Sequence, residues 1–260
     1  MSRFHTSPFA PMTASRLLLL CACLGLLAAC ASAPPDDGNP TRGSVPYAAL
    51  VDGDITIPAV DAAYLRAPNR RANVAYDGPE APGTIVVDPF TKFLYLVEEE
   101  GRATRYPIAV GREGRGFRGR ATVERKEVWP GWAPTANMLR TEPEVYGPFA
   151  GGIPGGVASP LGARSLYLYR GGRDTRYRIH GTNDLESIGN ATTAGCIRLF
   201  NQDIIDLFDR TPMGAEVVVR TYEESLASRD AEWIDRGVEL PPRIVDPDLI
   251  YAAVAAETGR

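Results

Sequence analysis

Short runs of β-branched and aromatic residues, separated by turn-forming residues, fill much of the chain from Thr84 onward. Two of these runs, residues 84–87 and 93–97, flank a turn at Asp88 and Pro89, and this spacing predicts a hairpin. Further strands are expected at residues 106–110, 121–128, 165–169, 177–180 and 216–220. Strands of this kind bury their apolar residues against one another, so we expect a mainly β domain.

One helix is expected to begin near Asn201. Asparagine is a good helix cap, and Asp203 falls in the first turn, where an acidic residue is favourable. Apolar residues then recur at helical spacing at Ile204, Leu207 and Phe208. This helix should pack one face on the sheet. Two shorter helices are expected near residues 225–235 and 248–256.

The N-terminus has the pattern of a bacterial export signal. Arg3 and Arg16 precede an apolar run at residues 17–27, which ends in small residues directly before Cys30. This ending resembles the lipobox of bacterial lipoproteins, which implies cleavage after residue 29 and a lipid on Cys30. An uncleaved membrane helix is the alternative, but a span needs about 20 apolar residues. In lipoproteins, alanine after the lipidated cysteine indicates the outer membrane, so we expect a periplasmic, lipid-anchored protein.

Removal of this signal changes the cysteine count and the charge. Cys21 and Cys23 lie in the signal and Cys30 takes the lipid, so Cys196 is the only remaining thiol and no disulfide can form within the mature chain. The mature chain keeps 26 basic and 32 acidic residues, a formal charge of −6. This charge argues against a nucleic-acid partner.

The composition divides the chain into four segments. They are a lipoprotein signal peptide at residues 1–29, a tether and loosely structured lead-in at 30–82, a catalytic domain at 83–221 and a C-terminal extension of unknown role at 222–260. The catalytic segment contains a long connection at residues 128–161, with a Gly/Pro run at 151–156. Trp129 and Trp132 in this connection either line a binding wall or plug the core.

His180 and Cys196 lie sixteen residues apart and form a candidate catalytic pair. A free thiol is mostly protonated at neutral pH, so a cysteine nucleophile needs a base beside it. His180 is the only histidine outside the signal. Gly195 leaves room for a substrate carbonyl, and the backbone amides of Gly195 and Cys196 are candidates for binding the developing oxyanion.

The residues around this pair resemble the L,D-transpeptidase catalytic domain family, the YkuD type. The resemblance rests on a His-Gly pair followed by a Ser/Thr-x-Gly-Cys segment that continues as Ile-Arg. The matching residues are His180, Gly181, Thr182, Asn183, Thr193, Gly195, Cys196, Ile197, Arg198, Leu199, Asn201 and Asp203. The similarity extends over residues 84–220. One departure is Ala194, which stands where many members have a second histidine.

This resemblance implies a β-sandwich of mixed strands, with one or two short helices after the cysteine. It also implies acyl transfer on peptidoglycan tetrapeptide stems, as donor and acceptor, without a metal or an organic cofactor. The backbone carbonyl of Gly181 would orient His180. Thr182, Asn183 and Thr193 would brace loops or bind substrate. Arg198 would bind a substrate carboxylate or, as its apolar neighbours favour, brace the cysteine loop.

Other mechanisms fit less well. Serine chemistry of the penicillin-binding type needs Ser-x-x-Lys, but Pro89 and Val123 stand three residues before Lys92 and Lys126. One histidine and one thiol do not supply the usual zinc ligands. Hydrolysis of the acyl-enzyme by water, attachment of a lipoprotein to peptidoglycan, and peptidoglycan binding without catalysis remain as alternatives to transpeptidation.

Overall fold

The computed structural model describes residues 46–112, 116–241, 243 and 246–258. The export signal, Cys30 and the tether up to residue 45 lie outside the described residues, so the lipid anchor stays a prediction. None of the described helices is both long enough and apolar enough to cross a membrane.

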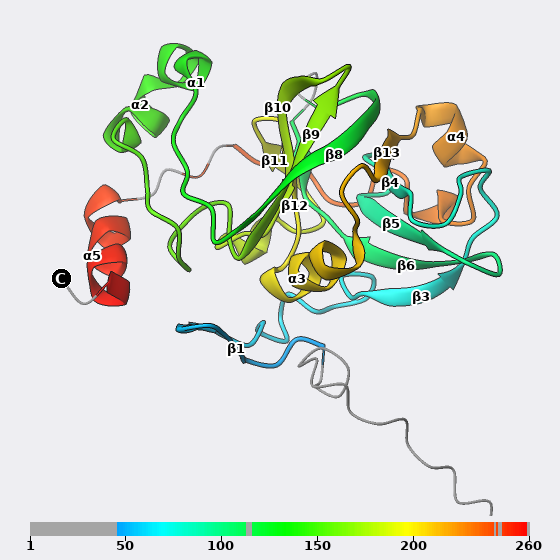
Figure 1. Ribbon diagram of the computed structural model, residues 1–260, viewed down its shortest axis with the longest axis horizontal. Coiled ribbons are helices and arrows are strands. Elements are labelled where there is room, and N and C mark those ends of the chain that lie inside the picture. Colours follow the sequence, from blue (N-terminus) through cyan, green and yellow to red (C-terminus); the bar gives the residue numbers. More distant parts are fainter. Residues whose placement is uncertain (1–45, 113–115, 242, 244–245, 259–260) are drawn as a thin grey trace, which may run out of the picture. The chain divides into compact units, whose positions relative to one another are not determined.

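A nine-stranded mixed sheet dominates the described part of the chain (Figure 1). Its strand order is β12-β10-β9-β8-β13-β4-β5-β6-β3, in which β10–β12 and β13–β4 are parallel pairs and the other pairs are antiparallel. The strands are β3 (Ala72–Ala75), β4 (Ile85–Asp88), β5 (Phe93–Glu98), β6 (Arg102–Pro107), β8 (Gly119–Val128), β9 (Arg164–Arg170), β10 (Arg173–His180), β12 (Ile197–Arg198) and β13 (Glu216–Val219). The mainly β fold is therefore confirmed.

Two small sheets accompany the large one. β1 (Leu50–Asp52) pairs antiparallel with β2 (Ile55–Ile57), and β7 (Val110–Gly111) pairs parallel with β11 (Ala191–Thr193). The single strand expected at residues 106–110 is therefore divided between β6 and β7. The reason lies at Ala109, whose backbone exchanges two hydrogen bonds with Arg198 and so leaves the β6 ladder.

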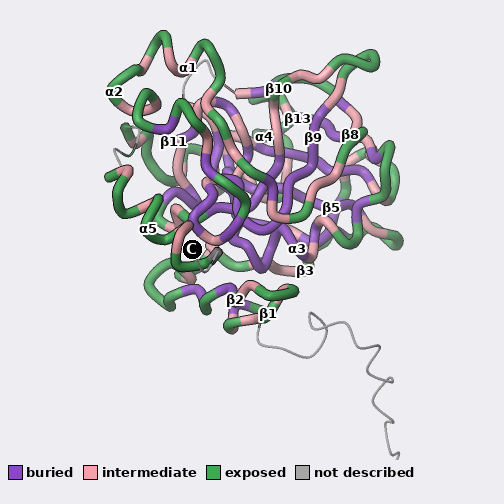
Figure 2. Tube along the Cα trace, turned by 60° about the vertical axis from the view of Figure 1, so that its left-hand side comes forward, coloured by how far each residue is buried: buried purple, intermediate pink, exposed green. Residues whose placement is uncertain are grey.

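The sheet curls around the largest of four clusters of buried residues among the described residues. In Figure 1, β8, β9 and β10 run across the direction of β5, β6 and β3. The main cluster of buried residues accordingly joins both halves of the sheet, with Leu94 and Leu96 from β5 and Leu166 and Leu168 from β9. Helix α3 (Asn201–Arg210) adds Ile204 and Leu207 to the same cluster, as its apolar spacing predicted. Figure 2 shows these buried segments as the purple centre of the molecule.

The remaining helices are short and lie in the connections. They are α1 (Ala136–Thr141), α2 (Pro143–Tyr146), η1 (Gly147–Phe149), η2 (Leu185–Ser187), α4 (Tyr222–Leu226), η3 (Ala231–Trp233) and α5 (Pro247–Thr258). The predicted cap of α3 is wrong. The cap position is Phe200, which makes no side-chain hydrogen bond there, while Asn201 begins the helix and turns its side chain elsewhere.

The described part of the lead-in is more ordered than the sequence indicated. β3 forms an edge of the large sheet, in register with β6. The Tyr47 hydroxyl donates to Asp203 of α3 (3.1 Å), and the Arg71 guanidinium lies 2.8 Å from the carboxylate of Asp206. Asp203 lies in the first turn of α3, as the sequence predicted, and is completely buried. The described residues of the lead-in therefore pack on α3 and on the edge of the sheet.

The first part of the C-terminal extension also packs on the domain. The Tyr95 hydroxyl donates to Asp230 (2.6 Å), which also pairs with Arg105. Further on, the backbone of residues 238–240 bonds to β11, since Ala191 donates to the carbonyl of Val238 and Leu240 donates back to Ala191, each at 3.0 Å. The extension thus adds a strand-like segment beside β11. β11 ends three residues before Cys196.

Candidate active site

Two neighbouring parallel strands bring His180 and Cys196 to one place. β10 ends at His180, which lies in register with Arg198 of β12, and Ile179 lies in register with Ile197. Side chains alternate along a strand, so both isoleucines enter the core while His180 and Arg198 face the other side. Cys196 directly precedes β12, so the same alternation predicts its side chain on the side of His180, and its thiol accepts a hydrogen bond from the backbone of Arg178 in β10. The edge of the large sheet therefore holds the pair that the sequence predicted.

The tautomer of His180 follows from its backbone contact. Its Nδ1 lies 2.6 Å from the carbonyl oxygen of Gly181, and a carbonyl can only accept, so Nδ1 carries the hydrogen. Nε2 is then left with its lone pair. Burial of the ring, helped by the charge of Arg198, lowers the pKa of His180 to about 3. The imidazole is therefore neutral at physiological pH and can accept a proton, and the contact predicted for Gly181 is present.

Gly181 is held in a space that admits no side chain. A Cβ at this position would lie 2.2 Å from Oδ1 of Asn201 and 3.0 Å from the backbone nitrogen of Ala163. Asn201 is buried and spans the two neighbouring segments: its Oδ1 accepts from Ala163 N–H (2.9 Å), and its Nδ2 donates to the carbonyl of Thr182 (3.2 Å). The amide of Asn201 thus fixes the loop that orients His180. Its place in the family motif was the only sequence signal for this role.

Asn201→Ala is expected to lower the free energy of unfolding by about 2–4 kcal/mol, because a buried N–H and a buried carbonyl lose their partner. Asn183→Ala is the matched control. The Asn183 side chain also makes one hydrogen bond, to the carbonyl of Ala158 (2.7 Å), but the residue is exposed and water can replace that bond. Denaturant unfolding of both variants checks the difference, and equal losses would contradict the role assigned to Asn201.

Thr193 organises the turn before Cys196. Its hydroxyl accepts from Gly195 N–H (3.0 Å) and donates to the carbonyl of Cys196 (2.6 Å). Gly195 has φ of +137°, a conformation that favours glycine. The Gly195 amide is therefore engaged by Thr193. Of the two amides considered for the oxyanion, that of Cys196 is the better candidate.

The Cys196 thiol is half-buried and is the only free cysteine among the described residues. Burial raises its pKa, while a backbone hydrogen bond from Arg178 and the charges of Arg178 and Arg198 act in the opposite direction. Together with the low pKa of His180, this predicts a resting pair of neutral thiol and neutral imidazole. The thiol would then ionise only when the proton passes to His180.

The remaining motif residues brace the loops around the pair. Arg198 lies 3.3 Å from Asp184, whose other oxygen lies 3.4 Å from Arg243. Thr182 accepts from the backbone of Asp184 (3.0 Å). Together with the two backbone bonds of Arg198 to Ala109, these contacts favour the bracing role for Arg198. No cluster of three or more potential metal ligands lies within the described ranges.

The long connection before β9 has two parts that behave differently. Trp129 packs against the small cluster of Ile57, Ala163 and Ile205, so it plugs the core. Trp132 instead pairs with Ile153 through the backbone and lines a surface pocket. Trp129 therefore fits the core-plugging alternative, while a binding role for the wall that Trp132 lines stays a prediction.

Comparison with known proteins adds the family. The model of the L,D-transpeptidase catalytic domain, YkuD, matches residues 82–219. The chain is 34% identical over 139 residues to the Probable L,D-transpeptidase ErfK/SrfK of Escherichia coli (strain K12), covering 53% of this chain and 43% of that protein. It is 37% identical over 137 residues to the Probable L,D-transpeptidase YbiS of the same strain, covering 52% and 43%.

A solved structure from Brucella melitensis, named a Probable carnitine operon oxidoreductase caia, is 47% identical to this chain. It covers 60% of this chain and 98% of its own, with a TM-score of 0.41. The chain spans less than half the length of the two curated relatives. The family match itself covers more than half of the chain, and the chain therefore belongs to the L,D-transpeptidase catalytic domain family.

Proposed function

We propose that this protein is an L,D-transpeptidase that acts on peptidoglycan stem peptides through an acyl-enzyme on Cys196. The observation that carries the proposal is the orientation of His180, whose Nδ1–H donates to the backbone carbonyl of Gly181. This leaves Nε2 with its lone pair, and Cys196 directly precedes β12, the strand that pairs with β10 at His180. A nucleophile, a base and a group that orients the base are the parts that thiol acyl transfer needs.

In the first half-reaction, Cys196 attacks the carbonyl that joins the third, diamino-acid residue to the fourth residue, D-Ala. The thiol proton passes to Nε2 of His180 as the S–C bond forms. His180 then gives that proton to the amine of D-Ala as the C–N bond breaks, and a thioester remains on Cys196. The backbone amide of Cys196 is the candidate donor to the oxyanion of the tetrahedral intermediate.

In the second half-reaction, the side-chain amine of another stem attacks the thioester. His180 takes a proton from this amine and returns it to the departing thiolate of Cys196. The new amide joins two third-position residues, a 3→3 cross-link, and the enzyme returns to its starting protonation state. Water in place of the amine gives a tripeptide and an L,D-carboxypeptidase, while an amine of a lipoprotein gives an anchoring enzyme.

The proposal is tested by incubating the protein with purified tetrapeptide muropeptides and reading the products by mass spectrometry, with Cys196→Ala as the control. Dimers that carry a bond between two third-position residues support transpeptidation. Tripeptides alone indicate hydrolysis. A protein that yields neither product and whose thiol is not acylated by a carbapenem would refute the enzyme and leave the non-catalytic binding protein.

We also propose that the protein is held in the periplasm by a lipid on Cys30, in the outer membrane. The sequence around Cys30 and Ala31 supports this location. Cys30→Ser is expected to release the protein from the membrane fraction and to abolish incorporation of labelled palmitate in cells. Incorporation that persists in this variant would contradict the assignment of Cys30.

A further inference from the structure

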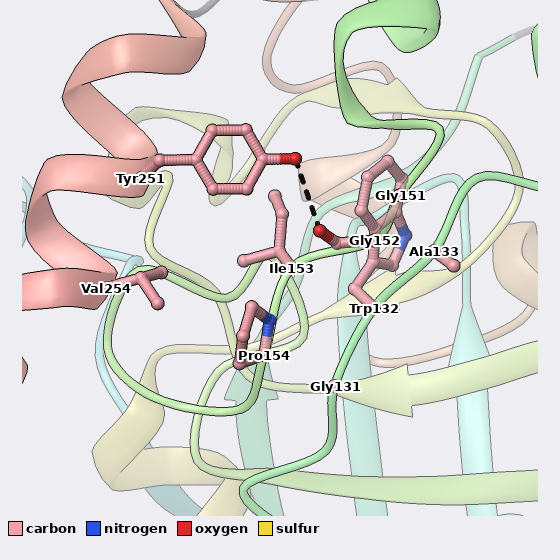
Figure 3. Close-up of a pocket in the computed structure, with 9 residues that line it drawn as sticks. All are labelled: Gly131, Trp132, Ala133, Gly151, Gly152, Ile153, Pro154, Tyr251 and Val254. Carbon is pink, nitrogen blue, oxygen red and sulfur yellow. Dashed lines mark hydrogen bonds between the residues drawn. The ribbon is translucent and has the colours of Figure 1, made fainter. Parts of the chain in front are cut away.

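The end of the C-terminal extension returns to the connection that precedes the catalytic loop. Helix α5 lies beside residues 151–158, and two of its side chains bond to that segment. The hydroxyl of Tyr251 donates to the carbonyl of Gly152 (3.2 Å), as Figure 3 shows. The carboxylate of Glu257 makes the second contact. The function proposed above assigns no task to this helix.

Both carboxylate oxygens of Glu257 accept hydrogen bonds from backbone amides, as those of a bound carboxylate ligand would. Val157 N–H donates to its Oε2 and Ala158 N–H donates to its Oε1, each at 3.1 Å. Two successive backbone amides that each take one oxygen form a small anion site without any charged side chain. The residue before them is Gly156, with φ of +150°, and a Cβ there would lie 2.0 Å from Oε2. Glycine therefore leaves the space that the carboxylate occupies.

This amide pair is joined directly to the catalytic loop. The carbonyl of Ala158, whose N–H binds Glu257, accepts from Nδ2 of Asn183 (2.7 Å). Asn183 lies three residues after His180. Farther along the same segment, a Cβ at Gly162 would lie 2.6 Å from the backbone nitrogen of Thr182, so the two segments are in close contact. A ligand on the amide pair is therefore held next to the loop that carries the base.

A surface pocket of about 560 Å³ lies alongside, between α5 and the connection. Its walls include Trp132, Ile153 and Pro154 on one side and Tyr251 and Val254 of α5 on the other (Figure 3). α5 thus covers apolar surface in addition to filling the amide pair. Glu257 itself is exposed to solvent, so water and a competing carboxylate can reach it.

We propose that the amides of Val157 and Ala158 form a binding site for the C-terminal carboxylate of the stem tetrapeptide, and that Glu257 fills this site until the substrate displaces it. This inference rests on the proposed function, which supplies the peptide. The tail then acts as an internal competitor. Substrate binds only to the fraction of molecules whose amide pair is free, and its apparent affinity is reduced by that fraction.

The test uses the full chain with Cys196→Ala, so that binding is measured without turnover. Two ligands are titrated by calorimetry: the tetrapeptide with a free C-terminal carboxylate, and the same peptide with a C-terminal carboxamide. Glu257→Gln is expected to raise the affinity for the acid about three- to tenfold, because the neutral amide competes less well for the two N–H groups. The affinity for the carboxamide peptide should change much less.

Asp248→Asn is the matched control, since Asp248 is an exposed acid of the same helix. It should leave both affinities as they are. An equal gain for acid and carboxamide, no gain in Glu257→Gln, or no binding of the acid to any variant would overturn the inference. ¹H–¹⁵N spectra add a local readout, because only the proposed site predicts that the acid shifts the Val157 and Ala158 amide resonances in Glu257→Gln.

The outcomes for this site and for the proposed function are separable. If wild-type protein forms cross-linked dimers but the acid shows no preference in Glu257→Gln, the function stands and the tail is a structural element. If the acid binds at the amide pair but no muropeptide product forms, the carboxylate site stands and the transpeptidase proposal fails.

Discussion

Cys196→Ala is expected to reduce the release of D-Ala from a tetrapeptide by a factor on the order of 10⁴ or more, because the variant has no atom that can carry the acyl group. Cys196→Ser should lose nearly as much. A neutral imidazole whose pKa is about 3 is a weak base for a serine hydroxyl, which is far less acidic than a thiol. The rate of D-Ala release and the intact mass of the acylated protein measure both variants.

Stability measurements provide the control for these variants, since a folded but inactive protein is the expected result. Burial raises the pKa of Cys196, so the unfolded chain releases the thiol proton first, near its usual pKa of about 8.5. Stability is therefore lost as the pH rises above that value, and Cys196→Ala should lack this part of the loss. Residual D-Ala release by folded Cys196→Ala at the wild-type rate would rule out Cys196 as the nucleophile.

Strands rich in β-branched residues could be predicted even where a partner is distant in the sequence, as for β13 with β4, while β3 could not. The hairpin of β4 and β5 has both halves and its turn within fourteen residues, and it forms in the structure with Ile85 opposite Leu96. β3 has only four residues, two of them half-buried, and no periodic pattern marks it. It is stabilised by β6, on the far side of the β4–β5 hairpin, so its pairing is a tertiary effect.

The candidate site shows the same division between local and tertiary signals. His180 and Cys196 could be proposed because they are the one histidine and the one cysteine outside the predicted signal and Cys30, and the family motif connects them. Asn201 was assigned to a helix cap because propensity describes only its own helix. Its actual partners, Ala163 and Thr182, come from two other segments that meet it only in the folded chain.

No function could be predicted for the C-terminal extension, because it contacts the domain through single residues that are spread along a polar sequence. Asp230, Arg243 and Glu257 each bond to a different part of the domain. No spacing rule connects them, since each partner is more than fifty residues away in the chain. The sequence alone does not distinguish a charged residue with a distant partner from a charged residue that is exposed to solvent.

His180→Gln is expected to lower kcat/KM for D-Ala release by about 10²–10⁴, the range that a positioned general base contributes. Glutamine keeps a polar side chain in the buried position but cannot take the thiol proton. The variant then depends on the small fraction of Cys196 that ionises by itself. Its residual rate should therefore rise with pH through the alkaline range, about tenfold per pH unit, until the thiol titrates.

The rate of D-Ala release by the wild-type protein should depend on pH in a different way, because the imidazole of His180 stays uncharged well into the acidic range. With the pKa of His180 lowered to about 3, protonation of this base removes no activity between pH 7 and pH 5.

The lowered pKa of His180 also makes the stability of the protein depend on pH. The unfolded chain takes up a proton near pH 6.5 that the folded chain refuses until about pH 3, so stability falls as the pH drops through this window. Folded His180→Gln should lack that part of the acid sensitivity. A wild-type activity profile with an acid limb near pH 6.5, or a variant whose rate is independent of pH, would show that the buried neutral imidazole is not the base.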